Sequence, residues 1–280
     1  MRPFWMFFPA LFLASVAVVA QPDAPGTPVT IYAGGADVTQ PQLLPLVASP
    51  SYSSANCHYA DDGTATFSLI VDSNGQPRNI YFLSPIGDDL DLIALKEVTT
   101  DRFSPGKRGD QPVAVAASLQ VKLHACLAER KDARGKTQNV LELTSAPEQQ
   151  LQPPVDPPQQ TVLVAGSGLL ANSSDPDGGI EKPGADVKPP VQFPPTKSTI
   201  ENLTQALGRG AYKVSVVVDQ FGLPQRLKVI DAELPDREQT LAGILRLYRW
   251  KPAFKNGAPV PYRIEVKIGA GSDAAGGRRR

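Results

Sequence analysis

The stretch YKVSVVVDQFGLP, Tyr212–Pro224, decides the predicted fold because the chain contains it twice in related form. Its counterpart is FSLIVDSNGQP at Phe67–Pro77, and each copy has a closing half, RWKPAFKNGAPV at 249–260 and RFSPGKRGDQPV at 102–113. The offset is constant at 147 residues (219 − 72 = 147). A repeat this long, present twice, predicts a duplicated domain and not a short-period solenoid. The shared residues are turn formers and a basic–aromatic pair: Asp72 and Asp219, Gly75 and Gly222, Pro77 and Pro224, Arg102 and Arg249, Phe103 and Trp250, Pro105 and Pro252, Pro112 and Pro259.

Both copies predict the same order of elements: strand, strand, helix, strand. Apolar and polar residues alternate before each Asp-x-x-Gly, which indicates a strand with one buried face, and Gly tolerates the positive φ of a hairpin turn. The first helix should place Leu92, Leu95 and Val98 on one face, with Asp88 or Asp89 as its cap. The predicted elements are strands at 64–71, 80–83 and 113–123 with a helix at 91–100, then strands at 212–218, 223–230 and 260–268 with helices at 198–207 and 236–248.

These patterns predict an α+β fold class with two small domains, each a three-stranded antiparallel sheet with one packed helix. We expect the domains at 31–127 and 193–270, followed by a disordered tail at 271–280. The intervening 128–192 is rich in Pro, Gly and Gln, a composition that favours a semi-stiff linker. Its apolar patch Thr161–Ala171 is expected either to add an edge strand to one domain or to serve as a docking segment.

The N-terminus has the pattern of a secretory signal peptide. Residues 1–20 carry one charge, Arg2, and an apolar run that ends in small residues before the polar stretch that begins at Gln21. An uncleaved membrane anchor is the alternative, but the run is slightly short for a bilayer core of about 30 Å and Pro9 interrupts it. The sequence therefore predicts an exported, periplasmic protein of a Gram-negative envelope.

The only two cysteines, Cys57 and Cys126, flank the three predicted strands of the first domain. An even number of cysteines in an exported chain favours a disulfide between them. Because His58 adjoins Cys57 and His124 lies close to Cys126, a Cys₂His₂ zinc site is an alternative, as are free thiols. Adjacent Cys and His are poorly spaced to bind one metal ion, so we expect the disulfide and no metal.

Composition and motifs argue against catalysis and against nucleic-acid binding. Lys+Arg and Asp+Glu both number 28, so no broad field of one sign is expected to attract nucleic acid or cations. The two histidines both lie near cysteines, which leaves no candidate for a Ser-His-Asp set. Gly166-Ser-Gly168 lacks the Lys and the helix of a phosphate loop. We therefore expect no enzyme activity, no cofactor and no small-molecule substrate.

The repeated stretch resembles the TonB C-terminal domain family. That family shows a valine-rich strand ending in Asp-x-x-Gly, a helix, an Arg-aromatic turn, then Gly-x-Pro-Val and a last strand. The second copy matches at Val216–Asp219, Gly222, Arg249, Trp250, Pro252, Gly257, Pro259 and Val260. The first copy matches at Asp72, Gly75, Arg102, Phe103, Pro105, Gly109, Pro112 and Val113.

The resemblance implies a periplasmic module that binds outer-membrane receptors or other envelope proteins by adding one of their segments to the edge of its sheet, and that is linked to TonB-dependent transport. The last strand is the candidate edge, flanked by Arg249 and Trp250, which are expected either to stabilise the fold or to contact the partner. Two further hypotheses stay open: a structural or homodimerising envelope protein without energy coupling, and a metal- or redox-responsive module built on Cys57, His58, His124 and Cys126. The candidate strand residues are Tyr262, Arg263, Ile264, Glu265, Val266, Lys267 and Ile268.

Overall fold

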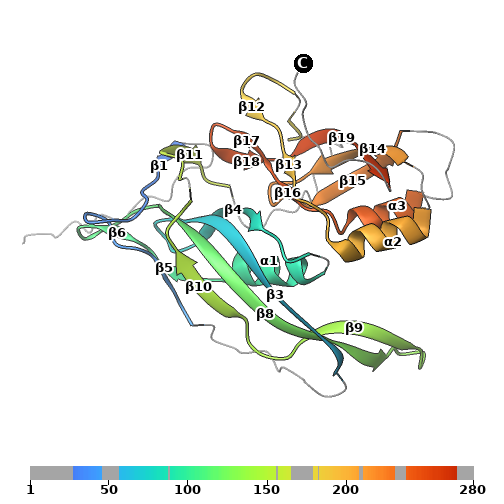
Figure 1. The fold of residues 1–280 in the computed structure, drawn as a ribbon. Helices are drawn as coiled ribbons and strands as arrows, with labels where there is room; N and C mark the ends of the chain where they lie inside the picture. Colours follow the sequence, from blue (N-terminus) through green and yellow to red (C-terminus); the bar gives the residue numbers. More distant parts are fainter. Residues whose placement is uncertain are drawn as a thin grey trace, which may run out of the picture.

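The computed structural model describes residues 28–45, 57–87, 89–155, 157–164, 179–181, 183–207, 211–230 and 238–269. Its architecture is α+β, dominated by antiparallel strands with three helices among the described residues (Figure 1). The predicted signal peptide at 1–20 and the predicted tail at 271–280 lie outside the described residues. Of the helices described, none is both long and apolar enough to span a bilayer.

The first sheet has the strand order β10-β8-β3-β4, and β9 also pairs with β8. Its second hairpin, β8–β9, projects from the body of the molecule (Figure 1). The helix α1, Leu90–Thr100, packs against one face of the sheet. The strands are β3 (Cys57–Val71), β4 (Pro77–Ser84), β8 (Val115–Lys131), β9 (Thr137–Leu143) and β10 (Glu148–Gln152).

The alternation in β3 produces the first core, as predicted. Phe67, Leu69 and Val71 are fully buried, and the rings of Phe67 and Phe82 lie 4.6 Å apart. Each such side chain stabilises the fold by about 1.5–3 kcal/mol through burial. Residues of β8 and α1 complete this core, so one apolar face of the sheet is covered by the helix.

The buried face of α1 agrees in part with the predicted one, since Leu95 and Val98 are buried as expected and Leu92 is not. Leu90, Ala94 and Val98 face the sheet at helical i, i+4 spacing, whereas Leu92 is 45% exposed. The buried stripe runs through Leu90, Ala94 and Val98, and Leu92 lies two residues beyond Leu90, on the other side of the helix. Asp89 stands at the N-cap position without a side-chain cap bond.

The second sheet has the order β15-β14-β19, with α2 and α3 on one face (Figure 1). Its core combines Val214 and Val218 of β14 with apolar residues of α3, and Trp250 fills one end of that core. The elements are α2 (Lys197–Leu207), β14 (Ala211–Val218), β15 (Pro224–Val229), α3 (Glu238–Leu245) and β19 (Tyr262–Gly269).

Short strands extend both halves. They form the pairs β1–β11, β2–β5, β6–β7 and β13–β16 and the three-stranded set β12-β17-β18. Their bounds are β1 Pro28–Thr30, β2 Gln42–Leu43, β5 Phe103–Ser104, β6 Lys107–Arg108, β7 Gln111–Pro112, β11 Gln160–Val162, β12 Val187–Lys188, β13 Val191–Gln192, β16 Trp250–Lys251, β17 Ala253–Lys255 and β18 Ala258–Val260.

The range 128–192, predicted as a linker, differs from that prediction in its described part. It contributes β9 and β10 to the first sheet, and it supplies β11, β12 and β13. The reason is that an existing sheet edge offers backbone hydrogen bonds to any extended segment, so a segment too polar to form its own core still becomes a strand. The patch Thr161–Ala171 pairs with β1 at its start, and its part beyond Val164 lies outside the described residues.

The two halves are packed against each other. Phe221 and Leu223, which follow the second copy of the repeated strand, belong to the buried core of the first half. Tyr81 of β4 meets Phe254 of β17 edge to face, with ring centroids 5.0 Å apart. The second half therefore completes the core of the first instead of lying at the end of a spacer.

Candidate functional site

The candidate site is the last strand, β19, which lies at the edge of the second sheet. It pairs with β14 along its full length, from Ala211–Gly269 to Val218–Tyr262. The predicted alternation is observed: Tyr262 and Ile268 are buried, whereas Arg263 and Lys267 are exposed. Within the described ranges, no other named strand pairs with β19. An unpaired edge of this kind carries backbone N–H and C=O groups that a further strand can use.

An apolar groove of about 580 Å³ runs beside the first half of β19. The N–H of Glu181 donates to the carbonyl of Pro261 at 2.9 Å and forms a parallel bridge to the start of the strand. This contact occupies the start of the edge, and beyond it no strand of the described residues other than β14 pairs with β19. The groove is lined by Ile180, Pro183, Pro189, Tyr262 and Ile264, with Ser215 and the charged residues Glu181, Arg263 and Glu265 at its rim.

Arg249 and Trp250 do not present side chains to a partner. They are 3% and 1% exposed, respectively, and Trp250 stacks on Tyr248 within the second core at a centroid distance of 6.0 Å. The Arg249 guanidinium donates to the carbonyls of Tyr248 and Arg246 and lies 2.9 Å from the carboxylate of Asp91. Of the two roles expected for this pair, the structure therefore supports the stabilising one. Arg102, its counterpart, is exposed and donates to the nearby carbonyls of Thr100 and Asp101.

Asp91 connects the helix start of the first half to Arg249 of the second. Its carboxylate accepts hydrogen bonds from the N–H groups of Ile86 (2.7 Å) and Gly87 (3.2 Å), besides the contact with Arg249. Burial raises the pKa of Asp91, and the nearby guanidinium and the two amide donors partly oppose that rise. The ion pair is therefore a structural contact between the halves, and it could not be predicted because its partners are far apart in the chain.

The two repeated turns are the same structure. Asp72 accepts the N–H groups of Asn74 and Gln76, and Asp219 accepts those of Phe221 and Leu223, each at 2.9 Å. Such side-chain bonds to the backbone explain why aspartate is required at the first position. Asp219 is fully buried, and this desolvation raises its pKa to about 6 although its hydrogen bonds oppose the rise.

The repeated glycines are required by a close approach between backbones. The carbonyl of Gly75 accepts the N–H of Phe103 at 3.0 Å, and the carbonyl of Gly222 accepts that of Trp250 at 2.9 Å. A Cβ on either glycine would lie 1.9 or 1.8 Å from the carbonyl oxygen of the same aromatic residue, and both glycines have positive φ. In each copy the glycine of the turn contacts the backbone of the aromatic residue directly. This contact explains why the turn and the basic–aromatic pair recur together at the same spacing in the sequence.

A third turn of the same kind, missed by the sequence analysis, ends the β8–β9 hairpin. Asp132 accepts the N–H groups of Arg134 and Lys136 at 2.9 Å, and Gly135 has a φ of 78°. The spacing Asp-x-x-Gly was visible in the sequence. No close backbone faces Gly135 within 4 Å, so this turn lacks the contact that distinguishes the other two.

The repeat also begins earlier than the sequence analysis placed it. The stretch IYAGGADVTQPQLLP at 31–45 corresponds to IEKPGADVKPPVQFP at 180–194, with an offset of 149 (180 − 31 = 149). The contacts correspond as well: Leu44 donates to the carbonyl of Arg102, and Phe193 donates to that of Arg249, each at 2.9 Å. The Gly-Ala-Asp-Val that both stretches contain could have revealed this earlier start from the sequence. It places the start of the second copy at about 180, inside the predicted linker.

The open edge of β19 has a counterpart in the first half that is occupied. There β10 pairs with β8, from Glu148–Lys122 to Gln152–Ser118. Gln149 donates to the carboxylate of Asp101 at 2.9 Å, which ties β10 to the C-terminal end of α1. Burial raises the pKa of Asp101 to about 7, with the nearby Glu97 as a lesser cause.

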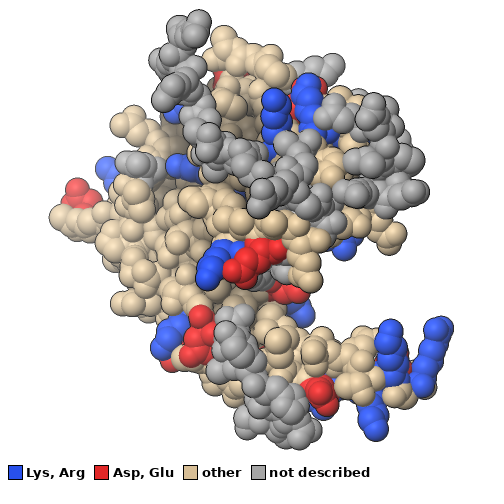
Figure 2. Space-filling model, turned by 45° about the vertical axis from the view of Figure 1, so that its right-hand side comes forward, with Lys and Arg blue, Asp and Glu red and all other residues tan. Residues whose placement is uncertain are grey.

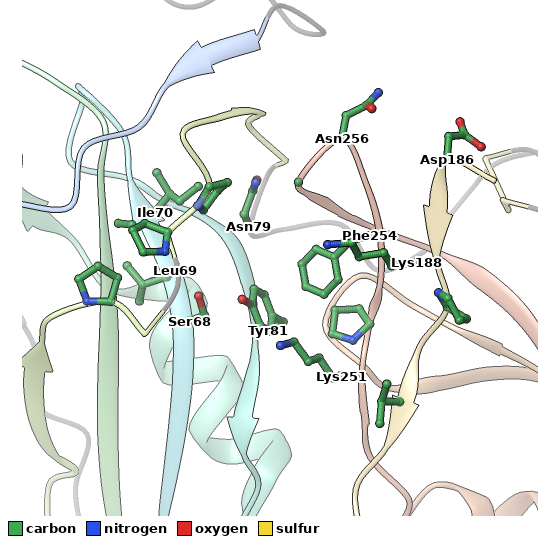
Figure 3. Close-up of a pocket in the computed structure, with 18 residues that line it drawn as sticks. Ser68, Leu69, Ile70, Asn79, Tyr81, Asp186, Lys188, Lys251, Phe254 and Asn256 are labelled. Atoms are coloured by element: carbon green, nitrogen blue, oxygen red, sulfur yellow. The ribbon is translucent and has the colours of Figure 1, made fainter. Parts of the chain in front are cut away.

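A second groove, of about 590 Å³, lies where the halves meet (Figure 3). Tyr81 and Phe254 face each other in it, and the amine of Lys251 lies 5.9 Å from the centroid of the Phe254 ring (Figure 3). These contacts join β4 to β17. The contacts in this groove are therefore part of the packing between the two halves.

The cysteine and histidine residues favour no metal site. Cys126 is disulfide-bonded, and a disulfide sulfur is no thiolate ligand. The other cysteine of the sequence is Cys57. The side chains of Cys57 and His58 lie outside the described residues, so the disulfide between Cys57 and Cys126 stays a prediction. The ring of His124 contacts Asp62 at 3.1 Å and Glu148 at 3.2 Å. Nowhere in the described part of the chain do three potential ligands form a metal-binding group.

Charged side chains are mixed on the surface. On the face shown in Figure 2, basic and acidic residues both lie among uncharged ones on the body of the molecule, and several basic side chains gather on the arm at the lower right. Comparison with known proteins adds no identification: no family model, curated protein or solved structure matches this chain.

Proposed function

We propose that this chain is an exported, non-enzymatic binding protein of the Gram-negative envelope, in which two strand-strand-helix-strand domains form one unit and the second offers β19 to a segment of an envelope protein. The observation that carries the proposal is the open edge of β19 with an apolar groove beside it. Main-chain hydrogen bonds supply affinity in strand addition, and neighbouring side-chain pockets supply selectivity.

The resemblance to the TonB C-terminal domain supports the class of partner. Outer-membrane receptors are the partners that it implies, and a link to TonB-dependent transport follows from them. The buried position of Arg249 and Trp250 limits the binding surface to β19 and its groove. A homodimer in which two β19 edges pair is the competing use of the same surface.

Site-specific photo-crosslinking in intact cells tests the proposal. A photoreactive residue replaces Lys267, exposed on β19, or Lys228, exposed on β15 at the opposite edge of the sheet. We expect a crosslink to an envelope protein from position 267 and none from 228. Crosslinks between two copies of this chain from 267 would instead show the dimer. Equal crosslinking from both positions, or none from either, would refute binding at this edge.

A further inference from the structure

We infer that the segment bound at β19 runs antiparallel to it and matches β10 in direction, length and one aliphatic position: a five-residue extended segment with an aliphatic side chain opposite Val266, and, unlike β10, a carboxylate opposite Lys267. This inference rests on the proposed function, because it specifies what the β19 edge accepts.

The edges of β8 and β19 are equivalent. At the offset of 147, Val115 at the start of β8 corresponds to Tyr262 at the start of β19. Each start forms a parallel bridge on the same side, Tyr32 to Val115 and Glu181 to Tyr262. The hydrogen bonds agree too, since Tyr32 and Glu181 donate to the carbonyls just before these strands at 3.0 and 2.9 Å.

The strand β10 therefore shows, within this chain, what kind of segment can pair with such an edge. It pairs antiparallel with residues 118–122 of β8, which correspond to 265–269 of β19. In the described part of the second half, those positions have β14 as their single strand neighbour. The chain itself shows the direction and the length of a segment that such an edge holds.

Packing against the apolar core determines which side chain we expect at one position of the bound segment. Leu151 of β10 lies opposite Leu119 and packs against the first core. The equivalent of Leu119 is Val266, which is half-buried and packs against the second core. An aliphatic side chain opposite Val266 would extend that apolar layer, as Leu151 does in the first half.

The charge of Lys267 determines which side chain we expect at the neighbouring position of the bound segment. Gln150 lies opposite Gln120, whose equivalent is the exposed Lys267. Glu265 already pairs with Lys213 at 2.7 Å, whereas no ion pair of the described residues involves Lys267. A carboxylate opposite Lys267 would supply an opposite charge, and cross-strand pairs of opposite charge stabilise antiparallel strands.

The test uses the full chain and a synthetic peptide, APEQELQP, which is the sequence of 146–153 with Gln150→Glu. A nitroxide is attached to either end of the peptide, and NMR line broadening is measured along β19. We expect the N-terminal label to broaden Ile268 and Gly269, and the C-terminal label to broaden Arg263 and Ile264. The Lys267→Glu variant should bind this peptide about two- to fivefold more weakly and the unmodified sequence equally well.

Three results would overturn the inference: broadening in the reverse order, which means a parallel segment; broadening confined to residues 118–122, which means exchange with β10; and no loss of affinity in a control peptide with Leu151→Asp. If the peptide fails to bind while Lys267 still crosslinks to an envelope protein, only the inferred chemistry fails. If the crosslink fails as well, the proposed function fails with it.

Discussion

The Arg249 guanidinium lies 2.9 Å from the carboxylate of Asp91, and both side chains are almost completely buried. One residue belongs to the second copy of the repeat and the other to the helix of the first. A buried charge is tolerated when it is paired and hydrogen-bonded, and removal of one partner leaves the other uncompensated. The two halves are therefore coupled through this contact.

Replacement of Arg249 should destabilise the whole described fold. We expect Arg249→Met to lower the free energy of unfolding by about 3–5 kcal/mol, because Asp91 would remain buried without its counter-charge. Urea unfolding at pH 7 measures the change. Arg102→Met is the matched control, since Arg102 is exposed at the equivalent position and its loss should cost no more than about 0.5 kcal/mol. Equal effects of the two substitutions would disprove the coupling.

The glycine contacts predict a difference among three similar turns. Gly75→Ala and Gly222→Ala place a Cβ within 1.9 Å of a backbone oxygen, so each should cost clearly more than the about 1–2 kcal/mol of a positive φ alone. Gly135→Ala has the same φ problem without the clash and is the control. Thermal unfolding ranks the three variants. A Gly135→Ala variant as unstable as the others would show that φ alone explains these glycines.

Acidic residues with raised pKa values predict that stability falls as pH rises. The pKa of Asp101 is about 7 in the fold against an ordinary 3.8, so the folded state keeps a proton that the unfolded chain releases between these values. The stability supplied by this group is full below about pH 4 and is lost by about pH 7. Asp219, with a pKa of about 6, acts in the same direction.

Asp101→Asn should therefore flatten the pH profile and stabilise the protein above pH 7 by about 1–3 kcal/mol, because the amide is neutral at every pH. Urea unfolding between pH 4 and pH 8.5 measures this, and a reduced slope should remain because of Asp219. Asp110→Asn, in an exposed loop, serves as the control and should reproduce the wild-type profile. An unchanged profile in Asp101→Asn would contradict the assigned cause.

Exchange of turn residues tests the docking of the halves. Phe221 and Leu223 are buried in the first core, whereas their counterparts Asn74 and Gln76 face outward more. The double variant Phe221→Asn, Leu223→Gln keeps the Asp219–Gly222 turn but removes its apolar contacts. We expect rapid cleavage between the halves in limited proteolysis, because the first core loses two buried side chains. The reverse exchange at Asn74 and Gln76 should leave proteolysis unchanged.

The local elements could be predicted from sequence because they depend on neighbours in the chain. The alternation of apolar and polar residues predicted β3, β14 and β19. The Asp-x-x-Gly spacing predicted the hairpins β3–β4 and β14–β15. The added strands could not be predicted from composition: β10 is held by the β8 edge and by Asp101, not by its own propensity. A stabilising role for Arg249 was one of the two expected, but its partner could not be predicted, since Asp91 is 158 positions away (249 − 91 = 158).

Because of that distance, the native packing of the first half depends on residues that come much later in the chain. During synthesis Asp91 leaves the ribosome 158 residues before Arg249. Until then the helix start of the first half contains an acidic group with no counter-charge, and its core lacks Phe221 and Leu223. The first half therefore reaches its native packing only when the second half is present. Although the two copies share one pattern of turns and contacts, they are packed as one unit.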